Sequence, residues 1–234
     1  MTVPFWYPPV LAYHRVHPRP GKDTPTISPR IFEKQMAILA QRWEPTPLSE
    51  VVTRLESGCP IPRRVVVVSF DDGTEDTFTF AFPILAQYRI PATVFLIAGH
   101  IDKPGSLNSD QIRTMGQNGI SFGSHTLSHS YLPSLSQAQV NDELQGSKRR
   151  LETFGFPIDL LSYPAGGFTP AIVKAVQEAG YKAACTTNRG IRRFPINRWA
   201  IRRISMHEKA ASILGMWVRL SGYYGLNRRL RAPA

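Results

Sequence analysis

Two adjacent carboxylates stand at the end of a strongly apolar run in this sequence. Residues 65–73 read VVVVSFDDG, so four valines lead into Asp71 and Asp72. Neighbouring carboxylates repel each other, and a bound cation or a shared proton relieves that repulsion. The same letters also suit an ordinary turn, because Asp tolerates unusual backbone angles and Gly supplies a positive φ. Taken alone, this short stretch favours the turn over the metal site, since short motifs often match by chance.

A pair of histidines follows another apolar segment further along the chain. Residues 120–129 read ISFGSHTLSH, which sets His125 and His129 four positions apart. If the chain becomes helical after Ser124, both imidazoles lie on one helix face, close enough to share an ion. Such a pair on its own also occurs on helix surfaces without any chemical role. Joined by one carboxylate, however, it forms a ligand set that leaves metal positions open, which suits catalysis.

The third feature is the stretch LSYPAGGF, Leu161–Phe168, which ends another apolar run. Its proline and glycines predict a sharp loop whose backbone N–H groups can point toward a site. It is also compatible with an ordinary turn before a helix capped by Thr169.

Apolar segments with many β-branched residues precede these features and alternate with helical ones. Strands are predicted over Val65–Phe70, Ala92–Ala98, Ile120–Ser124, Leu160–Tyr163, Ala183–Thr187 and Trp199–Met206. Helices are predicted to begin at Ser28-Pro29, after Thr74 with a bend or end at Pro83, at Ser136 with a capping box to Gln139, and at Thr169-Pro170 with an end at Gly180. This alternation favours parallel strands with crossover helices, where functional residues gather at the carboxyl ends of strands.

The overall composition suits one domain over residues 1–234 with a basic segment at about 208–234. The net charge is +11, and residues 189–234 contain eleven basic residues but a single acidic one. Such an end suits phosphates, anionic lipid headgroups or nucleic acid. Two interpretations of Glu208–Arg231 stay open: a terminal helix packed on the domain, which the pattern favours slightly, and a segment that rests on an anionic membrane surface or a lipid-linked glycan. Cys59 and Cys185 fit no metal motif and are either thiols or one bridge.

The start of the chain lacks the basic and apolar regions of a signal peptide, and no apolar run approaches the ~20 residues of a spanning helix. The sequence therefore predicts a cytoplasmic protein, or one peripheral to the membrane, and leaves open whether an export segment has been removed.

The motifs SFDDG, SHTLSH and SYPAGG resemble, in order and separation, the first three motifs of the polysaccharide deacetylases, the NodB-homology or carbohydrate esterase family 4. The resemblance spans about Leu11 to Met206. It implies an α/β fold, a distorted (β/α) barrel, and a divalent metal, zinc before cobalt, nickel or iron(II). The implied activity is removal of N-acetyl groups from amino sugars of a polysaccharide, a glycan precursor or a lipid-linked sugar.

Carried over residue by residue, the resemblance implies a general base, Asp71, and three metal ligands, Asp72, His125 and His129. In the third motif, the usual Arg-x-Pro-aromatic pattern falls on Ser162–Ala165. An oxyanion contact from the Ala165 backbone N–H survives the change, and Tyr163 and Pro164 would contact substrate. The arginine that would orient the base is missing, and Arg202 or Arg203 is the candidate replacement.

The missing arginine and the stretch LAYHRV near the start are similar to the subgroup that handles poly-N-acetylglucosamine-type exopolysaccharides. Members of that subgroup can be circularly permuted, with a late strand moved to the N-terminus. In that case Val10–Tyr13 lies beside the Asp71 strand, and His14 at its carboxyl end faces the ion as general acid. The alternative acid is His207, near the chain position of the family's late Leu-x-His motif.

Two other functions compete with deacetylation at this point. One is another metal-dependent C–N hydrolase on the same fold, acting on a small amide, a cyclic imide or a nucleotide sugar. The other is a catalytically silent binding protein that uses the basic end, where aromatic residues interleave with arginines. No recognised nucleic-acid motif occurs in the chain, so we do not expect nucleic acid as a partner.

Overall fold

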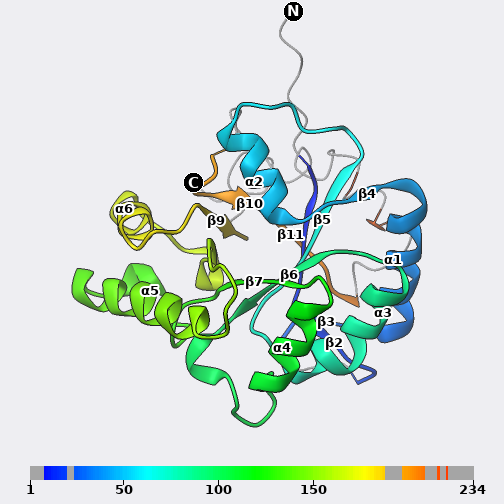
Figure 1. Cartoon of the computed structure of the whole chain (residues 1–234), viewed down its shortest axis with the longest axis horizontal. Helices are drawn as coiled ribbons and strands as arrows, with labels where there is room; N and C mark the ends of the chain where they lie inside the picture. Colours follow the sequence, from blue (N-terminus) through cyan, green and yellow to red (C-terminus); the bar gives the residue numbers. More distant parts are fainter. Residues whose placement is uncertain (1–7, 20–23, 188–196, 209–214, 217–219, 221–234) are drawn as a thin grey trace, which may run out of the picture.

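Parallel strands run through the centre of the molecule, and helices surround them (Figure 1). The computed structural model describes residues 8–19, 24–187, 197–208, 215, 216 and 220. Eight of its strands are hydrogen-bonded in the order β10-β9-β8-β7-β6-β5-β1-β11, and each pair of neighbours is parallel. They are β1 (Val10–Tyr13), β5 (Val65–Phe70), β6 (Ala92–Leu96), β7 (Ser121–Ser124), β8 (Leu160–Ser162), β9 (Ala183–Thr186), β10 (Ile201–Arg202) and β11 (Ile204–Ser205). β4 (Glu44–Pro45) pairs with the first two residues of β5, Val65 and Val66, and β2 (Arg15–Val16) pairs with β3 (Thr26–Ile27).

The two ends of this strand order are consecutive in the chain. Ile201 pairs with Cys185 of β9, whereas Ile204 pairs with Leu11 of β1. Between them stands Arg203, where the segment changes its partner strand. This change nearly closes the sheet into a distorted (β/α) barrel, as predicted, but it splits the single strand predicted here into two.

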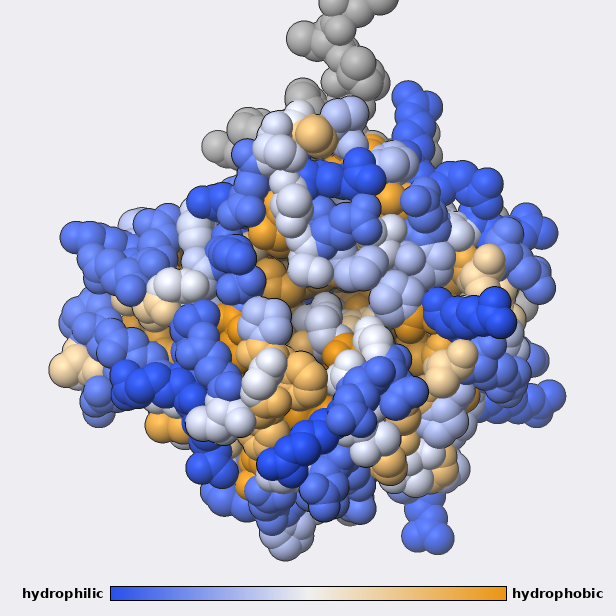
Figure 2. Space-filling model, in the orientation of Figure 1, coloured by the Kyte–Doolittle hydropathy of each residue, from blue (hydrophilic) through white to orange (hydrophobic). Residues whose placement is uncertain are grey.

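Four helical segments begin where the sequence predicts them, and two further helices, Leu48–Glu56 and Ser109–Gln117, were not predicted. The helices are α1 (Pro29–Arg42), α2 (Leu48–Glu56), α3 (Phe82–Gln87), α4 (Ser109–Gln117), α5 (Gln137–Glu152) and α6 (Pro170–Glu178). The predicted capping box of Ser136 with Gln139 is present at the start of α5. A π-helical turn, Thr77–Ala81, runs directly into α3, and Pro83 lies in the first turn of α3, so the irregularity predicted at this proline falls at the junction of the two. Hydrophilic side chains cover the outer face of α5 (Figure 2).

Side chains of the strands alternate between the barrel interior and the layer beneath the outer helices. On β5, Val65 and Val67 pack in one cluster with residues of α2, whereas Val66 and Val68 pack in the larger cluster with the outer helices. Helix α2 therefore closes the end of the barrel where the strands begin. The same alternation places Ser69, and Asp71 just after the strand, toward the interior, at the end of the barrel where the strands finish.

A glycine lets one ring fill the middle of the barrel. A Cβ added to Gly123 of β7 would lie 2.7 Å from the ring of Phe95 and 2.9 Å from the backbone oxygen of Leu160. The Phe95 ring in turn lies 5.1 Å beneath the guanidinium carbon of Arg203. The site above therefore rests on a packed apolar floor.

Two sequence expectations concern the rest of the chain. Cys59 is exposed and Cys185 is buried, and both are free thiols, so the alternative of a bridge is wrong. Most of the basic segment at 208–234 lies outside the described residues. Within the described part of the chain, we find no helix with the length and apolar character needed to cross a membrane.

Candidate metal and catalytic site

Three side chains from two strand ends converge on one point. Oδ1 of Asp72 lies 3.6 Å from Nε2 of His125 and 3.6 Å from Nε2 of His129. Their donor atoms all lie within 4.8 Å of one another. Ligand atoms of a tetrahedral zinc site, with bonds of about 2.0–2.2 Å, stand roughly 3.3–3.6 Å apart. The set therefore fits a divalent cation and leaves room for a further ligand.

A left-handed backbone brings Asp72 to this point. In a regular strand, Asp71 and Asp72 would face opposite sides of the sheet. Asp72 has φ 72° and Gly73 has φ 65°, so the chain turns over immediately after the strand. Aspartate tolerates this region better than most residues, and Gly73 is required because an added Cβ would lie 2.5 Å from Leu96. The turn and the metal site, predicted as alternatives, are compatible, because the turn at Asp72 and Gly73 is what carries Asp72 to the candidate metal site.

The two histidines meet by a different route from the predicted one. Residues 125–130 are not helical, so the helix expected after Ser124 is wrong. Thr126 and His129 both have φ 66°, and this loop brings the two imidazole rings to 4.7 Å between centroids. His125 is 3% exposed and His129 is 41% exposed, so the first is the inner wall and the second the rim of the site.

His125 is oriented by the neighbouring strand. Its Nδ1 lies 2.8 Å from the backbone oxygen of Ser162, which can only accept a hydrogen bond. This bond places the ring proton on Nδ1 and leaves the Nε2 lone pair directed at the cluster, as metal-binding histidines require. Burial lowers the pKa of His125, which favours the neutral ring that a ligand must have.

The other aspartate, Asp71, is held by a buried arginine. Arg203 donates from Nη1 to Oδ1 at 2.7 Å and from Nη2 to Oδ2 at 2.6 Å, a two-pronged contact inside the barrel. Burial alone would raise the pKa of Asp71, but the charge of Arg203, helped by His125 and His14, outweighs it and lowers that pKa well below its usual range. Asp71 is therefore ionised at neutral pH.

Arg203 also explains the departure in the third motif. The same guanidinium donates to Oγ of Ser162 at 2.7 Å and to Oγ of Ser69 at 3.3 Å. A small hydroxyl residue at 162 thus leaves room for an arginine that comes from the β10–β11 junction. Of the two candidates named from the sequence, Arg203 contacts Asp71.

His14 stands at the carboxyl end of β1, and β1 lies beside β5 as the permuted arrangement requires. Its Nε2 is 3.9 Å from Oδ2 of Asp71, its side chain is 20% exposed, and its buried Nδ1 has no hydrogen-bond partner among the described atoms. Ala12 pairs with Ser205, so the same register, continued two residues past the end of β11, sets His207 level with His14.

The loop of the third motif presents one residue to solvent near the site. Tyr163 is 1% exposed, its hydroxyl donates to the backbone oxygen of Trp199 at 3.0 Å, and its ring stacks on Phe168. Pro164 is buried as well. Both side chains support the loop from inside. Neither is exposed for the contact with substrate that the sequence suggested. Ala165 is exposed and has a left-handed backbone with φ 52°.

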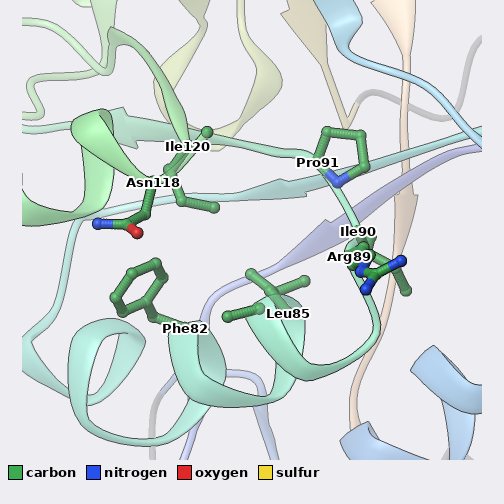
Figure 3. Close-up of a pocket in the computed structure, with 9 residues that line it drawn as sticks. Phe82, Leu85, Arg89, Ile90, Pro91, Asn118 and Ile120 are labelled. Carbon is green, nitrogen blue, oxygen red and sulfur yellow. The ribbon is translucent and has the colours of Figure 1, made fainter.

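A separate pocket of about 390 Å³ lies between α3 and the residues that precede β6 and β7 (Figure 3). Phe82, Leu85 and Ile120 form its apolar walls, and Arg89 and Asn118 lie at its edge. Because it adjoins the beginnings of these strands, it belongs to the end of the barrel opposite the aspartates and histidines.

Comparisons with known proteins agree with this geometry. The family pattern described as Polysaccharide deacetylase matches residues 60–184. The Bacillus subtilis protein YxkH, itself classed with the polysaccharide deacetylases, is 29% identical over 198 residues, which cover 84% of this chain and 70% of that protein. A Staphylococcus aureus poly-beta-1,6-N-acetyl-D-glucosamine N-deacetylase is 31% identical over 136 residues, 52% of this chain. The chain matches only 47% of that enzyme's length.

Among solved structures, the Streptococcus pyogenes deacetylase PplD, determined with acetate, superposes with a TM-score of 0.83. The superposition covers 91% of this chain and 97% of PplD at 24% identity, and it supports the fold alone. The family pattern spans more than half of the chain and includes both aspartates, both clustered histidines and the third motif. The chain therefore belongs to the polysaccharide deacetylase family.

Proposed function

We propose that this protein hydrolyses the N-acetyl amide of an amino sugar, within a poly-N-acetylglucosamine-type polysaccharide or a glycan precursor. The observation that carries the proposal is the pairing of a ligand set, Asp72 with two histidines, with a second aspartate that Arg203 keeps ionised. The name of the Staphylococcus aureus relative supports the choice of sugar.

The chemistry needs an activated water and a stabilised oxyanion, because an amide is a poor electrophile. A divalent metal, zinc in our proposal, supplies Lewis acidity to water and carbonyl when bound by Asp72, His125 and His129. Asp71 takes the proton from the attacking water as general base. The backbone N–H of Ala165 stabilises the oxyanion.

The leaving amine must receive a proton, and we assign that role to His14. His14 follows β1, on one side of β5, whereas the two histidine ligands follow β7, on the other side. Nε2 of His14 lies 3.9 Å from Oδ2 of Asp71. An imidazole can carry and release a proton near neutral pH. Arg203 moves no proton in this scheme, since its role is to hold Asp71 in place and in its charged form.

The proposed activity is tested by acetate release from a short N-acetylglucosamine oligomer, with simple acetamides, a cyclic imide and an acetylated nucleotide sugar as comparison substrates. We expect turnover of the oligomer to exceed that of every comparison substrate. Faster turnover of a small amide or nucleotide sugar would favour another C–N hydrolase on this fold, and no turnover of any of them would favour a binding protein.

The ligand assignment predicts the effect of single changes in the histidine pair. Replacing His125 or His129 by alanine removes one of three protein ligands, so metal occupancy and acetate release should both fall. Metal content of the purified variants, measured by atomic emission, checks the expectation. Full occupancy in both variants would contradict the assignment.

The two acid candidates differ in their expected effects. His14→Ala should lower acetate release about 10²–10⁴-fold, the usual contribution of a positioned general acid, while metal content stays unchanged. His207→Ala should change turnover little. The opposite result, a crippled His207→Ala and a nearly normal His14→Ala, would transfer the role to His207.

The cellular location of the protein and the partner of its basic segment are proposed from the sequence alone. We propose a cytoplasmic protein whose basic segment at 208–234 contacts an anionic membrane surface, where a lipid-linked sugar would be presented. The uneven charge of the chain supports this proposal.

A further inference from the structure

The loop between the two clustered histidines is tied to α5 by one carboxylate. Oε2 of Glu143 accepts hydrogen bonds from the backbone N–H groups of Leu127 and Ser128, both at 2.9 Å. Its Oε1 accepts from the hydroxyl of Ser128. One side chain thus binds three donors in the three-residue stretch that separates the histidines.

The opposite side of this loop is fixed by main chain. The N–H of Ala98 donates to the oxygen of Thr126 at 3.0 Å, and that of Gly99 donates to the oxygen of Leu127 at 2.7 Å. Gly99 permits this approach, because an added Cβ would lie 2.6 Å from the Leu127 oxygen. The loop is therefore clamped between main chain after β6 and Glu143, and only the second contact depends on a single replaceable side chain.

The two histidines do not share this support equally. His125 has the backbone oxygen of Ser162 to orient its ring. His129 is at the rim, and its Nδ1 has no hydrogen-bond partner among the described residues. Its recorded hydrogen bond is from its backbone N–H to Oγ1 of Thr126 at 3.1 Å. The position of the His129 ring thus follows the path of the loop that Glu143 holds.

We propose that Glu143 is a positioning residue of the metal site, which sets His129 at ligand distance from Asp72 by holding the backbone of residues 127 and 128. This inference rests on the proposed metal site and adds a residue that no motif of the sequence indicated. Residues that orient metal ligands typically contribute about 10–100-fold to metal affinity.

The test is the zinc dissociation constant of the metal-stripped full chain, measured by competition with a chromophoric chelator. Glu143→Ala should bind zinc about 10–100-fold more weakly than the unchanged protein. Glu143→Gln keeps an acceptor oxygen at the same reach and should recover most of the affinity. Asp142→Ala is the matched control, since it removes an exposed acid from the neighbouring position of α5 and should leave the constant unchanged.

A second variant and a second readout separate positioning from general stability. Glu143→Asp keeps the charge but cannot reach both N–H groups, so it should also weaken zinc binding, even if Glu143→Ala does not fold. Folded Ala or Asp variants with unchanged zinc affinity would overturn the proposal, including the case in which only their melting temperature falls. If the unchanged protein binds no zinc, the ligand assignment itself fails, which is a distinct result.

Discussion

Replacing Asp71 by asparagine is expected to lower acetate release about 10²–10⁴-fold while the metal stays bound. The asparagine has the shape of the aspartate and still offers one oxygen to Arg203, but it cannot accept a proton from water. The three proposed ligands lie elsewhere, since Asp72 faces the histidines and Asp71 faces the arginine. The measurement is acetate release per bound metal in the folded variant.

The comparison with Asp72→Asn makes this prediction specific. That variant should lose metal as well as turnover. The Asp71→Asn and Asp72→Asn proteins should therefore differ in the amount of metal that they bind. Near-normal turnover in a folded, metal-loaded Asp71→Asn protein would exclude the role of base. Loss of metal from both variants would mean that Asp71 also binds the ion.

Replacing Arg203 by methionine is expected to lower the free energy of unfolding by about 3–5 kcal/mol, because it leaves the Asp71 carboxylate buried without its partner. Arg203 is 3% exposed, and both oxygens of the aspartate depend on it. Denaturant unfolding of the variant measures this loss. The double variant Asp71→Asn/Arg203→Met should recover part of it, since no charge is then left unpaired. Additive effects of the two changes would contradict a coupled pair.

The same change should alter the pH dependence in a definite direction. With Arg203 present, the pKa of Asp71 is lowered from 3.8, so the pair contributes fully above about pH 4. That contribution is lost as the pH falls from there toward the lowered pKa of the folded state. Without the arginine, burial raises the pKa of Asp71, so the acid limb of the activity profile should move to higher pH. Arg202→Met, which removes a charge one residue away, serves as control and should leave the acid limb in place.

Local sequence signals were sufficient for the parts of the fold that depend on neighbouring residues. The strand Val65–Phe70 was predicted to the residue, because its apolar run ends abruptly at charged residues. The helix starts at Ser136 and Thr169 were also predicted, because their caps are formed by side chains within three positions. The barrel followed from the motifs rather than from any single segment.

The sequence offered Arg202 or Arg203 as the partner of Asp71 but could not choose between them, because that contact forms only when the barrel is assembled. Arg203 and Asp71 are 132 positions apart, and they meet because one segment switches from β9 to β1. The loop path of His125 and His129 depends on left-handed residues that periodicity does not reveal. The resemblance implied substrate contact for Tyr163, but this residue follows β8 directly and its side chain is buried.

The most direct test of the whole account is acetate release from a short N-acetylglucosamine oligomer by the full chain, before and after removal of metal with a chelator and after return of one equivalent of zinc. We expect the stripped protein to be inactive and one zinc per chain to restore activity. Full activity in the metal-free protein, or zinc bound at one equivalent without acetate release, would contradict a metal-dependent deacetylase built on Asp72, His125 and His129.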